Sequence, residues 1–151
     1  MKKKTSKKTK GFSLIELLIV VAIILIIAAI AIPNLLRARR SANEGSATAS
    51  MRTVGSGELL YRSTNGNFTT LAGLAADSII DNVLGSGVKS GYAFAATQGT
   101  SSDLQFTAVG TPSVSTGATQ TGARFFFTDE TQVVRFAVGA AATSGSGAIG
   151  N

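Results

Sequence analysis

An uninterrupted apolar run from Phe12 to Ile32 constrains this chain more than any other feature, because it holds a single charged residue, Glu16. As an α-helix rising ~1.5 Å per residue, the run would extend about 30 Å, the thickness of the hydrocarbon core of a bilayer. The composition of the chain differs after about Asn65. The sequence therefore predicts a membrane-spanning helix that carries a globular head.

The positive charge of the chain is confined to its first ten residues. Six lysines precede Gly11, whereas the rest of the chain has eight basic and eight acidic residues, so the net charge of +6 comes from this leader. A neutral body argues against a nucleic-acid partner. The positive-inside rule places the leader in the cytoplasm and the head outside the inner membrane.

Three arginines follow the apolar run on its other side, at Arg37, Arg39 and Arg40. The leader lysines outnumber them, which preserves the predicted orientation. We interpret these arginines as a solvated helix face. Lipid headgroups and acidic residues of neighbouring subunits are alternative contacts.

A secretory signal peptide is the alternative interpretation of the apolar run. Ala29-Ile30-Ala31 has the A-x-A spacing of a signal-peptidase site. However, the run exceeds the ~7–15 residues of a typical signal core, and Pro33 lies two residues beyond the bond that would be cut. These features favour a helix that stays in the mature protein.

The residues around Gly11 carry a family resemblance. The stretch from Gly11 to Ile24, GFSLIELLIVVAII, resembles the processing and methylation motif of type IV prepilins and of the pseudopilins of type II secretion. The resemblance implies that a prepilin peptidase removes residues 1–11 by cutting between Gly11 and Phe12, and that the same enzyme methylates Phe12. It also implies that Glu16 directs assembly into a helical filament, with pilus or type II secretion assembly machinery as partner.

Physical chemistry independently marks Glu16 as functional, because a carboxylate in a lipid-facing helix costs ~2.5–3.5 kcal/mol on insertion scales. Glu16 lies one helical turn from Phe12, which cleavage would provide with a free amine. We hypothesise that Glu16 of one subunit pairs with the Phe12 amine of a neighbour. Such a pair would determine how neighbouring helices align more than it would stabilise the filament. The alternative is a carboxylate that reaches the membrane interface before assembly.

The helix is predicted to continue as an amphipathic segment over residues 34–65 and to stop at Asn65-Gly66. Pro33 removes one backbone hydrogen bond and is predicted to kink the helix. Leu25 stands where many relatives carry glycine; leucine is the better helix former by roughly 0.8 kcal/mol, which argues against local unwinding between Leu25 and Pro33. Glu58 lies four residues before Arg62, a spacing that predicts a weak ion pair.

Residues 66–151 are predicted to form the head, with a flexible tail over 139–151. Asp77 is expected to cap a short helix that ends at Gly85. Alternating apolar residues predict four strands, at Ser90–Thr97, Leu104–Gly110, Ala123–Thr128 and Gln132–Val138. A hairpin is expected at residues 128–131. The predicted fold class is α+β and pilin-like, with the long helix packed on a small antiparallel sheet of about four strands.

The residue inventory predicts no enzyme and no cofactor. The chain has neither cysteine nor histidine, which excludes a thiol nucleophile, a histidine base and imidazole or thiolate metal ligands. Asp103, Asp129 and Glu130 could supply oxygen ligands for calcium, but they lack a D-x-D-x-D-G spacing. We therefore predict no metal site, and interpret Asp129 and Glu130 as turn residues.

The predicted function is that of a pilin, a structural subunit that polymerises through its apolar helix into a type IV pilus. It would span the inner membrane once before assembly and lie on the cell surface afterwards, as a homo-oligomer. A pseudopilin of type II secretion is the first alternative. A single-pass membrane protein whose head binds a ligand and never polymerises is the second.

Overall fold

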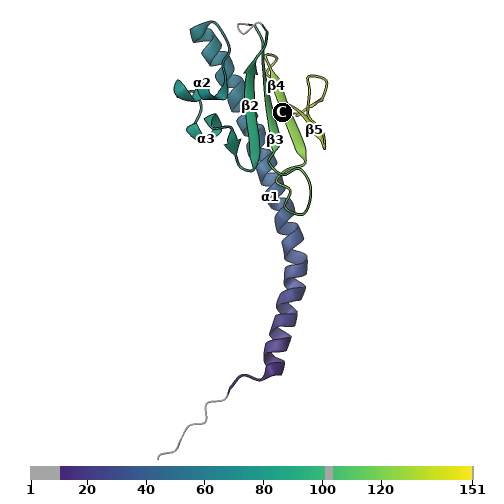
Figure 1. Cartoon of the computed structure of the whole chain (residues 1–151). Coiled ribbons are helices and arrows are strands. Elements are labelled where there is room, and N and C mark those ends of the chain that lie inside the picture. The colour runs from purple at the N-terminus through teal and green to yellow at the C-terminus, as the bar shows by residue number, and fades with distance from the viewer. Residues whose placement is uncertain (1–10, 101–103, 151) are drawn as a thin grey trace, which may run out of the picture. The chain divides into compact units, whose positions relative to one another are not determined.

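The computed structural model describes residues 11–100 and 104–150 and divides the chain into two compact units, residues 1–35 and 36–151. One helix, α1 (Leu14–Asn65), contributes to both units (Figure 1). It ends where the sequence predicted, because Gly66 adopts a left-handed conformation (φ 81°) and its N–H bonds the carbonyl of Arg62 at 2.8 Å. Helical geometry persists through Pro33, and the predicted kink there stays a prediction.

The described part of the N-terminal unit is almost entirely apolar helix. Its most apolar 18-residue window has a mean hydropathy of 3.3, and none of that window is buried. By length and composition this helix can cross a membrane. Because exposed apolar surface of this extent is unfavourable in water, lipid or other apolar helices must cover it.

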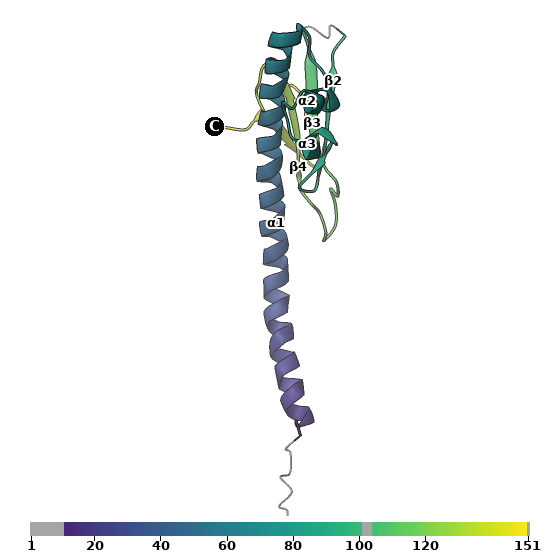
Figure 2. The same ribbon diagram turned by 90° about the vertical axis from the view of Figure 1, so that its left-hand side faces the viewer.

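The second unit is the head, in which the later part of α1 lies against one face of a β-sheet (Figure 2). Its buried residues recur every three or four positions, which places them on one helical face. They are Ala47, Ser50, Met51, Val54, Gly55, Gly57 and Glu58. The amphipathic half predicted for the helix therefore packs on the head.

The described residues form a six-stranded sheet in the order β1-β2-β3-β4-β5-β6, and every neighbouring pair is antiparallel. The strands are β1 (Val88–Lys89), β2 (Tyr92–Gln98), β3 (Phe106–Pro112), β4 (Arg124–Asp129), β5 (Arg135–Val138) and β6 (Gly147–Ala148). The prediction of about four strands was too low. It missed β1 and β6, which have two residues each and so cannot show an alternating pattern.

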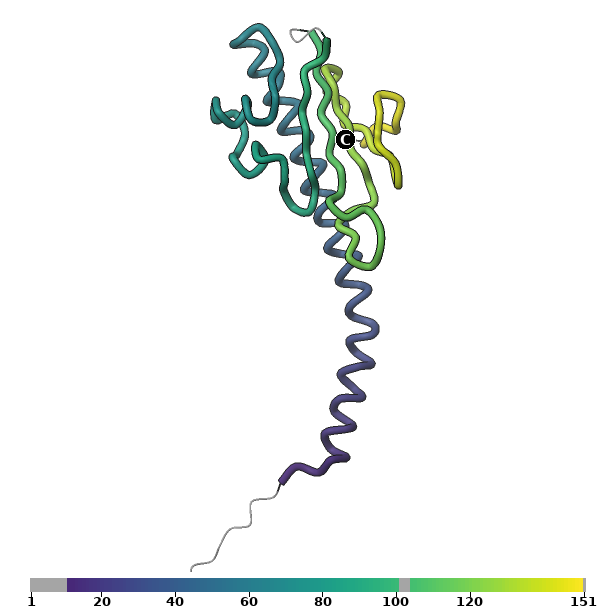
Figure 3. Tube along the Cα trace, in the orientation of Figure 1, coloured from purple at the N-terminus to yellow at the C-terminus, as the bar shows by residue number. Residues whose placement is uncertain are grey.

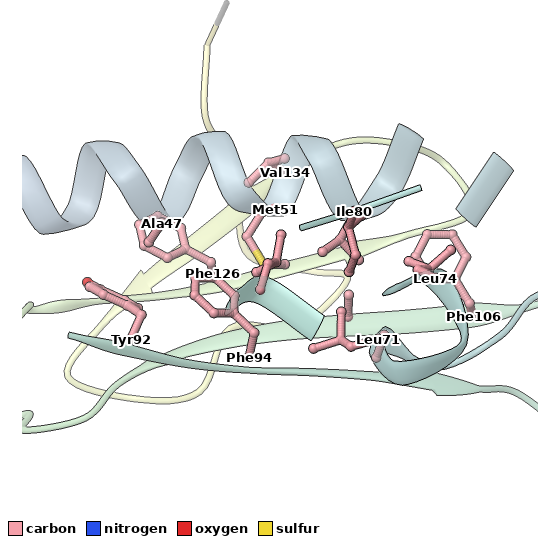
Figure 4. Close-up of a cluster of buried hydrophobic side chains, with 14 of the residues drawn as sticks. Ala47, Met51, Leu71, Leu74, Ile80, Tyr92, Phe94, Phe106, Phe126 and Val134 are labelled. Atoms are coloured by element: carbon pink, nitrogen blue, oxygen red, sulfur yellow. The ribbon is translucent and has the colours of Figure 1, made fainter. Parts of the chain in front are cut away.

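The core lies between α1 and the sheet, as Figure 4 shows. Tyr92 and Phe94 of β2 point into it, and the Tyr92 ring lies 5.5 Å from that of Phe126 on β4. Gly110 is paired with Phe94 across the β2–β3 ladder, and a side chain there would press on the Phe94 ring at 3.1 Å and the Met51 sulfur at 3.3 Å. A glycine in this strand thus leaves room for two large core side chains.

Two short helices connect α1 to the sheet: α2 (Leu71–Ala76), capped by Thr70, and α3 (Asn82–Gly85), capped by Asp81. The prediction that Asp77 caps the start of the helix ending at Gly85 was wrong. Asp77 follows the last residue of α2, and Asp81 accepts the Leu84 N–H at 3.0 Å instead. Aspartate is a good N-cap at either position, so the local sequence did not decide between them.

The C-terminal segment runs back along the sheet, as the trace in Figure 3 shows. Residues 147–148 pair with β5, and the Ile149 N–H bonds the Val134 carbonyl at 2.8 Å. Between β3 and β4, the connecting loop closes on itself where the Thr121 N–H bonds the Val114 carbonyl at 2.9 Å.

Candidate functional site

The predicted processing bond lies just outside the helix. Residues 11–13 have no regular secondary structure and α1 begins at Leu14. Phe12 is 90% exposed, and no atom lies within 4 Å of the position that a side chain on Gly11 would occupy. The peptide bond between Gly11 and Phe12 is therefore accessible and lies outside the helix. The lysine-rich leader, residues 1–10, lies outside the described residues.

Glu16 is the third residue of α1 and folds back onto the start of its own helix. Its Oε2 accepts the backbone N–H of Ser13 at 2.9 Å. Ser13 stands at the N-cap position, so this contact is one half of a capping box, in which the third helical residue satisfies a donor that the helix leaves unpaired. In a single chain the carboxylate of Glu16 therefore already has a hydrogen-bond donor.

A second carboxyl group, which the sequence analysis did not single out as functional, lies inside the head. The Glu58 side chain is fully buried; its Oε2 accepts the Thr69 N–H at 2.9 Å, and its Oε1 has no partner among the described residues. Burial raises the pKa of Glu58 to about 7, although the bond from Thr69 opposes the rise. Glu58 follows Met51 and Val54 at helical spacing, on the same buried face of α1. This spacing is the sequence signal that could have predicted its burial.

The predicted Glu58–Arg62 pair does not form. The guanidinium of Arg62 instead lies over the Phe68 ring, 5.1 Å from its centroid. Helical spacing brings the two residues to neighbouring positions, but Glu58 is buried in the core, while the Arg62 guanidinium lies over the ring of the buried Phe68. The i, i+4 rule describes exposed pairs and does not apply to a side chain buried by tertiary packing.

Further polar contacts hold the start of β4, from α1 and from β2. Glu44 accepts the Ala123 N–H at 2.8 Å and lies 3.5 Å from the guanidinium of Arg124. The Tyr92 hydroxyl donates to the carbonyl of Arg124 at 2.9 Å, and burial raises the pKa of the Tyr92 phenol. The Glu44 contacts hold the start of β4 against α1, and the Tyr92 bond joins β4 to β2.

The acids considered for calcium do not converge among the described residues. Asp129 Oδ1 accepts the Thr131 N–H at 3.0 Å, which is the turn role predicted for it. Asp103 lies outside the described residues. Within residues 11–100 and 104–150, no group of three or more acidic side chains is placed to hold a metal ion.

Comparison with known proteins identifies a matching family and two similar proteins. Residues 6–32 match the family described as the prokaryotic N-terminal methylation motif. The chain is 47% identical over 64 residues to the "Type IV wide pilus major component PilA4" of Thermus thermophilus, covering 42% of this chain and 49% of the relative. It is also 31% identical over 135 residues to the "Type IV major pilin protein PilA" of Myxococcus xanthus, covering 84% of this chain and 58% of the relative. Its homologues are type IV major pilins.

These matches confirm the resemblance that the residues around Gly11 carry. The pilin-like α+β arrangement is also present, with α1 packed on an antiparallel sheet. The chain spans about half the length of the curated relatives it matches. The similarity to structural pilins gives no indication of an enzyme.

Proposed function

We propose that this chain is the major structural subunit of a type IV pilus and that its mature form polymerises through α1. The observation that carries the proposal is the exposed apolar helix that begins beside a methylation motif. A filament core built from such helices would cover this surface after each subunit leaves the lipid. The two pilin relatives favour the pilus over the secretion pseudopilus.

Processing is the first proposed step. A prepilin peptidase would remove residues 1–11 and methylate the new N-terminal amine of Phe12. The accessible, non-helical segment before Leu14 supports this assignment, since a peptidase acts on extended backbone. Before processing the chain would span the inner membrane with its N-terminus in the cytoplasm, where the leader lysines hold it.

Assembly would then depend on Glu16. In a single chain its carboxylate accepts the Ser13 N–H, and in the filament it would pair with the Phe12 amine of a neighbouring subunit. An ion pair in a filament core is strengthened by the low dielectric, while loss of hydration offsets much of that gain. The pair therefore sets which helices align, and the apolar contacts supply the stability.

The test is to shear fibres from cells that carry the chain and to identify their N-terminal peptide by mass spectrometry. We expect a peptide that begins at Phe12 and carries one added methyl group. A native protein that begins downstream of Ala31 would refute the proposal, because the apolar helix would then have been discarded.

Glu16→Ala tests the assembly role separately. We expect the variant to be inserted and processed normally but to form no fibres. Glu130→Ala, which removes an exposed acid of the head, is the matched control and should assemble as the wild type does. Normal fibre yield from Glu16→Ala would show that this carboxylate does not direct assembly.

A further inference from the structure

A hollow of about 400 Å³, with Arg39 in its lining, lies at the start of the head between α1 and two loops. Leu36, Arg39 and Asn43 form its helical wall, because positions i, i+3 and i+7 share one face. The opposite wall consists of the β1–β2 turn, at residues 90–91, and the β3–β4 connection, at residues 119–121. All of these residues belong to the same compact unit.

The walls of the hollow are held in place by hydrogen bonds. The Asn43 carboxamide donates to the Thr121 carbonyl at 2.9 Å, which joins α1 to the β3–β4 connection. The Ser46 hydroxyl donates to that of Ser90 at 2.9 Å, which joins α1 to the β1–β2 turn. Ser90 and Gly91 both have positive φ, the conformation of a tight two-residue hairpin turn. A ligand would therefore meet preformed walls.

The chemistry of the lining favours an anion. Arg39 contributes the only charge of the lining, and the other polar groups are hydroxyls and carboxamides. The nearest acid in the sequence, Glu44, is engaged by Ala123 and Arg124. In the described part of the chain, the ion pairs are Lys89–Asp81 and Arg124–Glu44, so Arg39 has no carboxylate partner there.

The position of Arg39 along α1 suggests the source of the anion. Arg39 follows Ile32, the last residue of the apolar run, by seven residues, which is about 10 Å along a helix. The polar layer on each side of a bilayer core is roughly 5–8 Å thick. A long arginine side chain at this distance reaches the level of the phospholipid phosphates, and Arg37 and Arg40 add positive charge on either side.

We propose that this hollow binds the phosphate of an anionic phospholipid in the outward-facing leaflet while the chain resides in the membrane. The Arg39 guanidinium would hold the phosphate, and the polar lining would contact the headgroup. The bound lipid would set the depth and rotation of the head at the membrane surface. The inference rests on the proposed membrane insertion of residues 12–32, but it does not require that the chain polymerises.

The test uses the isotopically labelled full chain in nonionic detergent micelles, followed by amide NMR. Short-chain phosphatidylglycerol is expected to shift the amides of Gly91, Gln120 and Thr121 in a saturable way. Arg39→Gln should weaken the apparent affinity at least tenfold. Arg52→Gln, another exposed arginine of α1 that does not line this hollow, is the control and should bind as the wild type does.

Three results would overturn the proposal. The first is the absence of saturable shifts with phosphatidylglycerol. The second is equal binding by the Arg39 and Arg52 variants. The third is that inorganic phosphate shifts the same amides at the same concentration as the lipid, which would indicate a site for free phosphate. The assay does not measure fibres, so a negative result leaves the proposed pilin role standing, and missing fibres leave the lipid site standing.

Discussion

Raising the pH from about 5 to about 8 is expected to destabilise the head through the buried carboxyl group of Glu58. Its pKa is raised from 4.5 to about 7, mainly because burial penalises the charged form. Between these values the folded chain keeps the proton, while the unfolded chain has lost it. The stabilising effect of the neutral form is thus fully present below about pH 4.5 and is lost as the pH rises through 7.

The size of the effect follows from the shift. A rise of about 2.5 pKa units corresponds to roughly 3 kcal/mol of unfolding free energy, at ~1.4 kcal/mol for each unit. For a domain of this size, such a change would move the melting temperature on the order of 10–20 °C. The unpartnered Oε1 in an apolar enclosure is the structural reason that ionisation is so unfavourable.

Urea unfolding of the full chain in nonionic detergent micelles measures this directly. Both tyrosines, Tyr61 and Tyr92, lie in the head and the chain has no tryptophan, so tyrosine fluorescence reports on the head alone. Glu58→Gln retains an acceptor for the Thr69 N–H and cannot ionise. The variant should therefore lose the pH dependence and should exceed the wild type in stability above pH ~7.

Comparing the two proteins isolates Glu58 from other titrating groups. Asp81 acts in the opposite direction, because its hydrogen bonds from Lys89 and Leu84 lower its pKa, so its contribution is lost as the pH falls. The contribution of Asp81 is the same in both proteins, so it cancels when their unfolding free energies are subtracted. Parallel stability profiles for the wild type and Glu58→Gln between about pH 5 and pH 8 would show that the Glu58 pKa is not raised.

Three further predictions concern packing and helix propensity, and all are measured by the same unfolding assay. Met51→Ala should cost about 2–4 kcal/mol, because the Met51 side chain is fully buried between α1 and the sheet; a loss below about 1 kcal/mol would mean that the core can collapse around the cavity. Gly122→Ala should cost about 1–3 kcal/mol, since the added Cβ would overlap the hydroxyl oxygen of the buried Tyr92. Gly45→Ala, in an open helical position, should instead stabilise by roughly 0.5–1 kcal/mol.

The sequence predicted the elements whose signal is local. The apolar run, the stop at Asn65-Gly66 and the four longer strands could each be inferred from composition, turn chemistry or alternation. The observed bounds of β2, β3 and β4 lie within two residues of those expected, and β5 begins three residues later than expected. β1 and β6 exist only because a longer strand lies beside them, so tertiary pairing, and not local pattern, determines them.

The burial of Glu58 could not be predicted for the same reason. Its helical spacing places it on the apolar face, yet a carboxylate at such a position is ordinarily assigned to the surface. What permits its burial is the backbone N–H of Thr69, a residue of the loop that leads into α2. Only the folded head brings that donor to the helix.

Glu16 and Glu58, which lie on apolar faces of α1, make similar hydrogen bonds in very different surroundings. Each accepts one backbone N–H at 2.9 Å, Glu16 from Ser13 and Glu58 from Thr69. The donor of Glu16 is exposed and belongs to its own first turn, so water or a neighbouring amine can replace either partner without unfolding anything. The donor of Glu58 belongs to a distant loop and the bond is buried, so exchange requires opening the head. The partner exchange proposed for Glu16 is therefore compatible with its position at the helix terminus, whereas the bond of Glu58 fixes a loop within the core.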